Sequence, residues 1–221
     1  MEFLYSAVYG GDGYPFHAIA KEVKGVQLPE ELENPDSALI VWGGSDISPS
    51  LYNHPESTHT YPGGRRDFIE WALMKRAIEI GMPIIGICRG AQMACAAAGG
   101  FLIQEVRNHG SNHMVKTIDG DTIKVNSLHH QMMFPYQVEH KLLAWCENPR
   151  SIKQGDDGSL VSHYIYKDDQ FYVPEEGFKE PELVYFPKIK ALGIQWHPEM
   201  MTENALATKF IFNQMEEIGW L

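Results

Sequence analysis

The sequence has few cysteines and little positive charge. Its 221 residues include three cysteines and no CxxC pair. A disulfide framework and a zinc or dithiol redox motif are therefore not expected, and this cysteine usage is typical of a reducing cytoplasm. The 18 Lys and Arg against 29 Asp and Glu leave a net charge of −11. That balance argues against nucleic acid or anionic lipid as the main partner.

Long apolar runs are also missing. No stretch approaches the roughly 20 residues needed to cross a bilayer, the longest candidate being 91–103, and the first residues lack the basic region of a secretory leader. Neither a membrane span nor a leader is expected. With 44% hydrophobic and 21% charged residues, the composition is that of an ordinary globular protein. The length predicts a single domain over 1–221 with an insertion.

Short apolar runs alternate with helix-like stretches, which is typical of parallel strands joined by crossover helices and predicts an α/β fold. Strands are predicted at residues 2–9, 37–42, 83–87, 101–105, 113–118, 122–126, 183–186 and 191–196. Helices are predicted at 15–24, 65–80, 91–98 and 203–218, and Asp119-Gly120 predicts a hairpin turn. Gly, Pro and polar residues predict a long loop at 43–64 and a surface insertion at 147–181, with a short strand considered at 162–166.

The segment GICRGAQ places Cys88 between Gly86 and Gly90, where a buried strand runs into a helix. Such a nucleophile elbow pushes its side chain out of the sheet, and the glycines remove Cβ atoms that would collide as strand and helix converge. Helix N–H groups then face the thiol, favour the thiolate and can donate to an oxyanion. A buried structural cysteine is the alternative, which the flanking glycines disfavour.

The segment QWHPE supplies the base that a thiolate nucleophile needs. His197 ends a predicted strand, and Glu199 can accept a hydrogen bond from one of its ring nitrogens, so that the other nitrogen faces sulfur. Pro198 stiffens the turn between them. A His-Pro-Glu turn by itself is more often structural, but its combination with the elbow favours a catalytic role.

Together, GICRGAQ and QWHPE resemble the class I glutamine amidotransferase family. The segments GGSDISPSLY, RRDFIE, VNSLHHQ and GIQWHPE, with the glycine pair at 99–100, narrow the resemblance to the gamma-glutamyl hydrolase branch, peptidase C26. Within that branch the chain is similar to stand-alone hydrolases of gamma-glutamyl-gamma-aminobutyrate. The resemblance implies a flavodoxin-like, doubly wound, mostly parallel sheet with helices on both faces. It also implies Cys88 as nucleophile, His197 as base and then acid, and Glu199 as the group that orients His197.

The same resemblance implies further site residues. The backbone N–H groups of Gly44 and Arg89 would form the oxyanion hole, and Gln92 would lie near the substrate. The loop that flanks the glutamyl group in this branch corresponds to Ser127, His129 and His130. The implied activity is hydrolysis of the gamma-glutamyl amide bond of a small gamma-glutamyl amine or of glutamine, through a glutamyl thioester and without a cofactor.

Two other functions stay open at this point. A glutaminase subunit that supplies ammonia to a separate synthetase would use the same triad, and a catalytically silent binding module could share the fold. The leaving amine stays undetermined because pocket walls decide it. A homo-oligomer is also left open.

Histidines outside the triad raise the question of a metal site. His109 and His113 are four residues apart, and the pair His129-His130 follows. No carboxylate or cysteine near them in the sequence completes a ligand set, so no metal is predicted.

Other polar and aromatic groups receive structural interpretations. Arg65 and Arg66 are expected to pair with Asp67 or Glu70 at the start of a helix. The aromatic residues of the insertion could line a pocket for an amine tail, but packing of the insertion onto the core is favoured; they are Tyr164, Tyr166, Phe171 and Tyr172.

Overall fold

A nine-stranded sheet forms the centre of the molecule. The computed structural model describes residues 1–8, 13–20, 22–54, 60–106, 109–147, 165–167, 170–172 and 179–221. Neighbouring strands of the sheet follow the order β2-β1-β3-β4-β13-β12-β9-β6-β7. In chain order these strands are β1 Glu2–Ser6, β2 Glu22–Val26, β3 Ala38–Val41, β4 Ile84–Ile87, β6 His113–Thr117, β7 Thr122–Val125, β9 Lys141–Cys146, β12 Pro181–Phe186 and β13 Ala191–Ile194.

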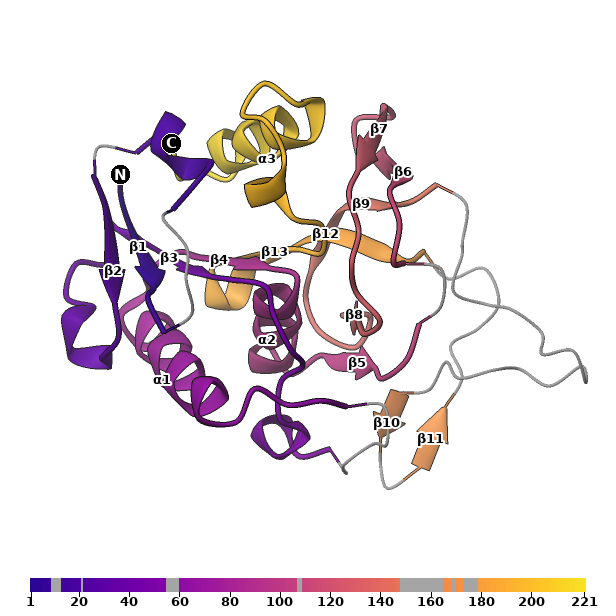
Figure 1. Cartoon of the computed structure of the whole chain (residues 1–221), viewed down its shortest axis with the longest axis horizontal. Coiled ribbons are helices and arrows are strands. Elements are labelled where there is room, and N and C mark those ends of the chain that lie inside the picture. Colours follow the sequence, from indigo (N-terminus) through magenta and orange to yellow (C-terminus); the bar gives the residue numbers. More distant parts are fainter. Residues whose placement is uncertain are drawn as a thin grey trace, which may run out of the picture.

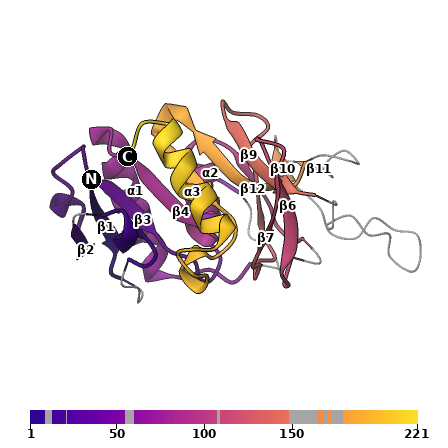
Figure 2. The same ribbon diagram turned by 90° about the horizontal axis from the view of Figure 1, so that it is seen from above.

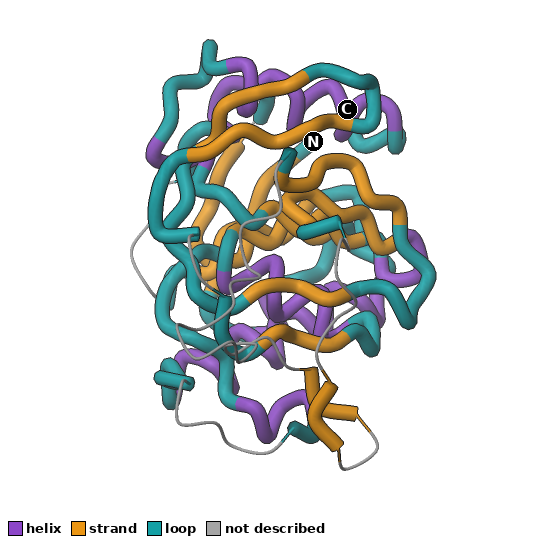
Figure 3. Tube along the Cα trace, turned by 90° about the vertical axis from the view of Figure 1, so that its right-hand side faces the viewer, coloured by secondary structure: helices purple, strands orange, loops and turns teal. Residues whose placement is uncertain are grey.

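The first five strands in this order are all parallel, and their sequence β2-β1-β3-β4-β13 is the 2-1-3-4-5 order of flavodoxin-like doubly wound folds. Antiparallel pairings then extend the sheet through β12, β9, β6 and β7. Two small sheets accompany it: β5 Phe101–Ile103 with β8 Met132–Phe134, and β10 Ile165–Lys167 with β11 Gln170–Tyr172. The β10–β11 pair lies away from the main sheet (Figures 1 and 3). The predicted α/β class and flavodoxin-like, mostly parallel sheet are confirmed.

Helices cover both faces of the sheet. The α-helices are α1 Arg65–Ile80, α2 Arg89–Ala97 and α3 Leu206–Glu217, and short 3₁₀ turns are η1 Phe16–Ala18, η2 Pro29–Glu31, η3 Pro49–Tyr52, η4 Pro187–Ile189 and η5 Pro198–Met200. In Figure 1, α3 lies on one side of the parallel strands and α1 and α2 on the other, and Figure 2 shows α3 crossing in front of β4. No helix in the described ranges is long and apolar enough to cross a membrane.

Alternation along the strands divides the core between these two faces. In β3, Ala38 and Ile40 pack in the cluster that contains α3, whereas Leu39 and Val41 pack in the cluster that contains α1 and α2. Because successive side chains of a strand point to opposite faces, a strand covered on both sides is apolar throughout. All four residues of β3, and likewise of β4 and β13, are buried.

Several predicted elements are confirmed. Helix α1 has the predicted bounds, and β3, β4, β12, β13 and α3 lie within the predicted segments or within two residues of them. Strands β6 and β7 pair antiparallel across the predicted turn at 119–120. Of the predicted insertion, residues 148–164, 168–169 and 173–178 lie outside the described residues, and so do all four of its aromatic side chains. The considered strand at 162–166 overlaps β10 at its last two positions.

The helix predicted at 15–24 is wrong. That segment holds the short turn η1 and then enters β2, whose residues pair with every residue of β1. Val23 and Val26 are β-branched and favour a strand, and the edge of the sheet offers backbone partners that a three-turn helix would forgo. Strands β8 and β9 were not predicted either, because isolated short apolar runs between loops carry no periodicity.

Candidate active site

Cys88 lies at the turn between β4 and α2. Its backbone has φ 50° and ψ −104°, a region that residues with a Cβ rarely occupy. Its N–H donates to the carbonyl of Ile194 at the end of the neighbouring strand β13. Its carbonyl accepts the N–H of Gln92 in the first turn of α2. The strained residue is therefore held on both sides, as expected where backbone strain is retained at a functional position.

Two glycines make this turn sterically feasible. A Cβ on Gly86 would lie 2.3 Å from the carbonyl oxygen of Gly90, and a Cβ on Gly90 would lie 2.1 Å from the carbonyl oxygen of Val41. Backbone cannot yield to such overlaps, so β4 and α2 approach this closely only because both positions lack a side chain. The predicted nucleophile elbow has the geometry described for this motif.

The turn after β13 places His197 beside this elbow. Its Nδ1 lies 2.7 Å from Oε1 of Glu199, within η5. Burial disfavours the charged imidazole, but interactions with Cys88 and Glu199 outweigh burial and raise the pKa of His197 to about 10. The Nε2 atom is buried and makes no hydrogen bond of ordinary geometry with the described residues. The imidazole is thus anchored through one nitrogen, and the other is left for a proton transfer at sulfur.

Two residues that the sequence interpretation did not single out also position His197. The Asn126 amide donates to the carbonyl of His197 and accepts its N–H, both at 2.8 Å. A Cβ on Gly43 would lie 2.8 Å from the His197 ring and 3.4 Å from Cβ of Cys88. Gly43 therefore lies against both predicted catalytic residues. Because Gly43 has no side chain, Cys88 and His197 can both pack closely against the loop after β3.

The predicted oxyanion hole borders the same corner. Arg89 directly follows Cys88, and Gly44 directly follows Gly43. Gly44 has φ 146°, and a Cβ there would lie 2.2 Å from Nη1 of Arg66. Arg66 in turn donates to the carbonyls of Trp42 and Gly43 at 3.2 and 2.9 Å. These bonds fix the loop after β3 from the carbonyl side.

A buried charge network joins α1 to the elbow. The Arg89 guanidinium, fully buried, bonds to both Asp67 and Glu70. Glu70 also accepts from Arg66 at 3.0 Å and from the Ser6 hydroxyl at 2.7 Å. The expected pairing of Arg66 with Glu70 is confirmed. The role of the Arg89 side chain was missed, because its partners lie 19 and 22 residues away in the chain.

The predicted substrate loop packs against α2. Gln92, itself buried, donates to the carbonyl of Gln131 at 2.9 Å. The Ser127 hydroxyl donates to the carbonyl of His109. His129 is buried with Nδ1 2.9 Å from the Gln131 carbonyl, and burial lowers the pKa of His129 to about 3, so its ring is neutral. Their substrate contacts stay predictions.

His130 faces the loop after β3 instead. Its Nε2 lies 3.0 Å from Asp46, and its Nδ1 lies 3.0 Å from Glu105. Hydrogen bonding with Asp46 and, more weakly, with Glu105 outweighs burial and raises the pKa of His130 to about 9. A cationic His130 therefore ties together two loops that flank the predicted site.

The thiol of Cys95 is unsuited to nucleophilic chemistry. Cys95 and Cys146 are buried, and burial raises the pKa of the Cys95 thiol to about 12. A thiol of that kind does not ionise near neutral pH. Cys88, in contrast, lies beside a histidine whose other ring nitrogen is held by a carboxylate.

The sequence profile of the Peptidase C26 family matches residues 7–121, just over half of the chain. The chain belongs to the Peptidase C26 family. Its membership places this Peptidase C26 protein in a class of C–N hydrolases and amidotransferases. It is similar to the gamma-glutamyl-gamma-aminobutyrate hydrolase PuuD of Escherichia coli, at 24% identity over 96% of this chain and 82% of PuuD.

Two further relatives match this Peptidase C26 protein over shorter segments, and one solved structure matches nearly all of it. Rv2859c of Mycobacterium tuberculosis, named for glutamine amidotransferases, is 40% identical over 37% of this chain but only 30% of its own length. The carbamoyl phosphate synthase small chain of Photobacterium profundum is 33% identical over 44% of this chain and 21% of its own length. A crystal structure of a glutamine amidotransferase from Thermotoga maritima has a TM-score of 0.56 at 15% identity, covering 98% of this chain and 83% of that one, and supports the fold.

Proposed function

We propose that the chain is a cysteine-dependent hydrolase of gamma-glutamyl amide bonds, acting on a small gamma-glutamyl amine or on glutamine. One observation carries this proposal: Cys88 occupies a strained elbow beside His197, whose other ring nitrogen is anchored by Glu199 at 2.7 Å. The similarity to PuuD over most of both chains supports the choice of bond.

In the proposed reaction, Nε2 of His197 already holds the Cys88 proton before substrate binds, because the pKa of His197 is raised to about 10. Sulfur attacks the side-chain carbonyl carbon of the glutamyl group, and the N–H groups of Gly44 and Arg89 stabilise the oxyanion. The intermediate collapses as His197 protonates the leaving amine, which gives a glutamyl thioester. Water, deprotonated by His197, then attacks the thioester, and glutamate and the Cys88 thiol are released.

The buried network of Arg66, Glu70 and Arg89 supports this chemistry structurally. It joins α1, the elbow and the Gly43-Gly44 loop, which together carry the nucleophile and both proposed oxyanion donors. Catalysis by oriented N–H groups requires that these groups be held before the substrate arrives. No metal or organic cofactor takes part in the proposed steps.

The deciding experiment measures glutamate release by the purified protein from L-glutamine and from a panel of gamma-glutamyl amines, with Cys88→Ala as the blank. Release from one gamma-glutamyl amine, with glutamine a poor substrate, is the expected result and names the amine. Release that requires an added synthetase would instead favour a glutaminase subunit, an alternative supported by the similarity to the carbamoyl phosphate synthase small chain. Turnover that survives in Cys88→Ala would overturn the proposal.

A further inference from the structure

A second cluster of buried ionisable groups lies outside the proposed triad. His109 precedes β6, His113 begins β6, and Glu180 and Glu182 lie at the start of β12. All four are buried, and the Glu180 and Glu182 side chains are fully so. The sequence offered no carboxylate near the histidines, but folding brings two from about 70 residues away. The cluster thus contains carboxylates that the sequence near the histidines lacks.

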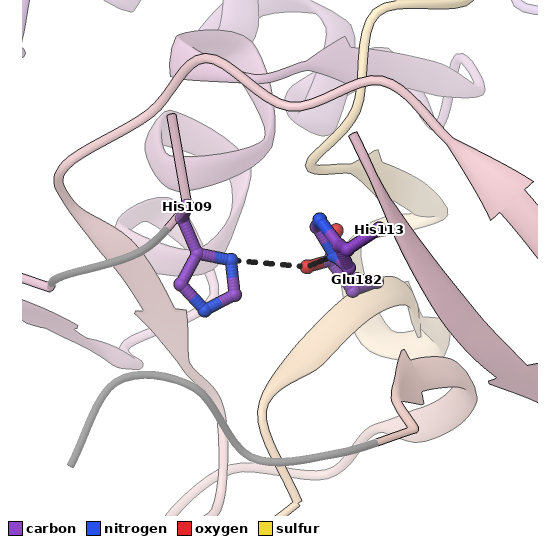
Figure 4. Close-up of side chains that lie close together, drawn as sticks. All are labelled: His109, His113 and Glu182. Carbon is purple, nitrogen blue, oxygen red and sulfur yellow. Dashed lines mark hydrogen bonds and ion pairs between the residues drawn. The ribbon is translucent and has the colours of Figure 1, made fainter. Parts of the chain in front are cut away.

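One carboxylate oxygen is approached by both histidines. Oε1 of Glu182 lies 2.8 Å from Nε2 of His113 and 3.5 Å from Nδ1 of His109 (Figure 4). One ligand atom from each of the three residues lies within 4.8 Å of the others. A tetrahedral zinc ion about 2.0–2.2 Å from each ligand atom holds those atoms roughly 3.3–3.5 Å apart. The cluster needs only small side-chain adjustments to enclose such an ion.

The other ring nitrogen of each histidine has an acceptor of its own. Nε2 of His109 lies 3.0 Å from Glu180, and Nδ1 of His113 lies 3.2 Å from the carbonyl of Ser111. Histidines that bind metals regularly donate their second N–H to a carboxylate or a backbone carbonyl, which fixes the tautomer and the ring orientation. Both imidazoles therefore have the outer contacts of metal ligands, and the remaining nitrogen of each is turned toward Glu182.

Several polar atoms of the cluster are buried without a hydrogen bond. Among the described residues, Oε2 of Glu182 and Nε2 of His129 find no hydrogen-bonding partner, and Nδ1 of His109 has only its 3.5 Å contact with Oε1 of Glu182. The ring of His129 packs against that of His109 with centroids 4.8 Å apart. Orphaned buried polar atoms each cost about 1–3 kcal/mol and are rare in native proteins. Two such atoms within one cluster of nitrogen and oxygen donors indicate a ligand.

We propose that His109 Nδ1, His113 Nε2 and Glu182 bind a divalent transition-metal ion of the zinc type. Two imidazoles and one carboxylate form a donor set that selects zinc-type ions. Magnesium and calcium bind it less well, because they prefer oxygen ligands. Because the side chains are buried, the ion enters during folding or a local opening. The proposed ion takes no part in the proposed hydrolysis.

The ion would have a structural role. The His109 carbonyl accepts hydrogen bonds from the Ser127 hydroxyl and from the N–H of His129. Metal ligation of His109 to Glu182 would therefore fasten the predicted substrate loop to β12 through His109. Structural metal sites of this kind contribute directly to folding stability.

The test measures the number of metal ions bound per purified chain after expression in defined medium with zinc or with cobalt. We expect about one zinc per chain after gel filtration, a visible cobalt absorption band typical of nitrogen and oxygen ligands, and a melting temperature about 5 °C lower after chelation. Wild-type protein that retains less than about half an equivalent of either metal would overturn the proposal. Hydrogen bonds from the histidines to the carboxylates would then hold the cluster together without a metal.

Variants then locate the ion. His113→Gln and Glu182→Gln should reduce bound zinc at least tenfold, whereas His17→Gln, at an exposed histidine, should retain it. Equal retention by all three would place the metal elsewhere and reject the site. Should the buried variants fail to fold, ¹⁵N NMR of the wild-type histidine rings decides, because zinc must shift His109 Nδ1 and His113 Nε2. Unchanged ring signals with zinc bound would also reject it.

Discussion

Asn126 holds His197 by both of its backbone polar groups. The amide donates to the His197 carbonyl and accepts the His197 N–H, each at 2.8 Å, across 71 residues of sequence. A strand edge normally satisfies such groups by pairing with another strand. Here a side chain replaces that strand, so the orientation of the proposed base depends on one residue of the loop after β7.

Replacement of Asn126 should therefore impair turnover more than substrate binding. Asn126→Ala leaves both His197 backbone groups without their partner and allows the ring to move, so we expect kcat to fall about 10–100-fold with KM nearly unchanged. The exposed Asn213 of α3 gives a matched control in Asn213→Ala. Steady-state kinetics give kcat and KM for both variants, on the substrate that the glutamate-release experiment identifies. An Asn126→Ala enzyme as fast as the control would contradict this role.

Cys88 should be needed for turnover but not for folding. Cys88→Ala removes the nucleophile, and we expect glutamate release to fall below detection while the protein stays folded. Cys88→Gly should be more stable than Cys88→Ala by about 1 kcal/mol, since glycine adopts φ 50° without strain. Urea unfolding of the two variants provides the measurement. Equal stabilities would mean that the elbow stores no strain.

The glycines of the elbow should not tolerate even one methyl group. Gly86→Ala would bring a Cβ to 2.3 Å from backbone, and we expect a loss of more than about 3 kcal/mol of stability or no folded protein. Gly110→Ala is the control, because nothing lies within 4 Å of its Cβ and its backbone is not in the left-handed region. Thermal melting distinguishes the two. A well-folded Gly86→Ala would show that β4 and α2 can separate freely.

Glu70 should contribute far more to stability than an exposed glutamate of the same helix. Glu70→Gln leaves Arg66 and Arg89 with a neutral partner in a buried site, so we expect a loss of about 3–5 kcal/mol. Glu79→Gln breaks only the exposed pair with Arg76 and should cost less than about 1 kcal/mol. Similar losses in chemical denaturation would show that the network is dispensable.

The contact of His130 with Asp46 and Glu105 should make stability depend on pH in the alkaline range. The pKa of His130 is raised from 6.5 to about 9 in the folded protein. Its contribution is therefore complete below about pH 6.5 and disappears as the pH rises through 9. Because the side chain is 39% exposed, we expect less than about 1 kcal/mol. The stability difference between wild type and His130→Gln should shrink between pH 6 and pH 10; a constant difference would contradict the ion pair.

Local chemistry let the sequence by itself determine the elbow, α1 and the buried parallel strands. Gly86 and Gly90 indicate by themselves that two backbone segments approach closely. The spacing of apolar residues in 65–80, with Gly81 after it, predicts a helix without reference to any distant residue. The proposed triad could be predicted from the sequence because its residues belong to short local motifs. Cys88 is part of one compact motif, and His197 and Glu199 are only two residues apart.

Only the tertiary structure decided the contacts between distant segments. The edge strand β2, the bonds from Arg89 to α1 and the meeting of Glu182 with His109 and His113 depend on which strands become neighbours. The residue type at one position does not predict which residue about 70 positions away it will contact. Burial of those polar groups becomes favourable only once the sheet has brought the partners together, because each alone would lose its contact with water.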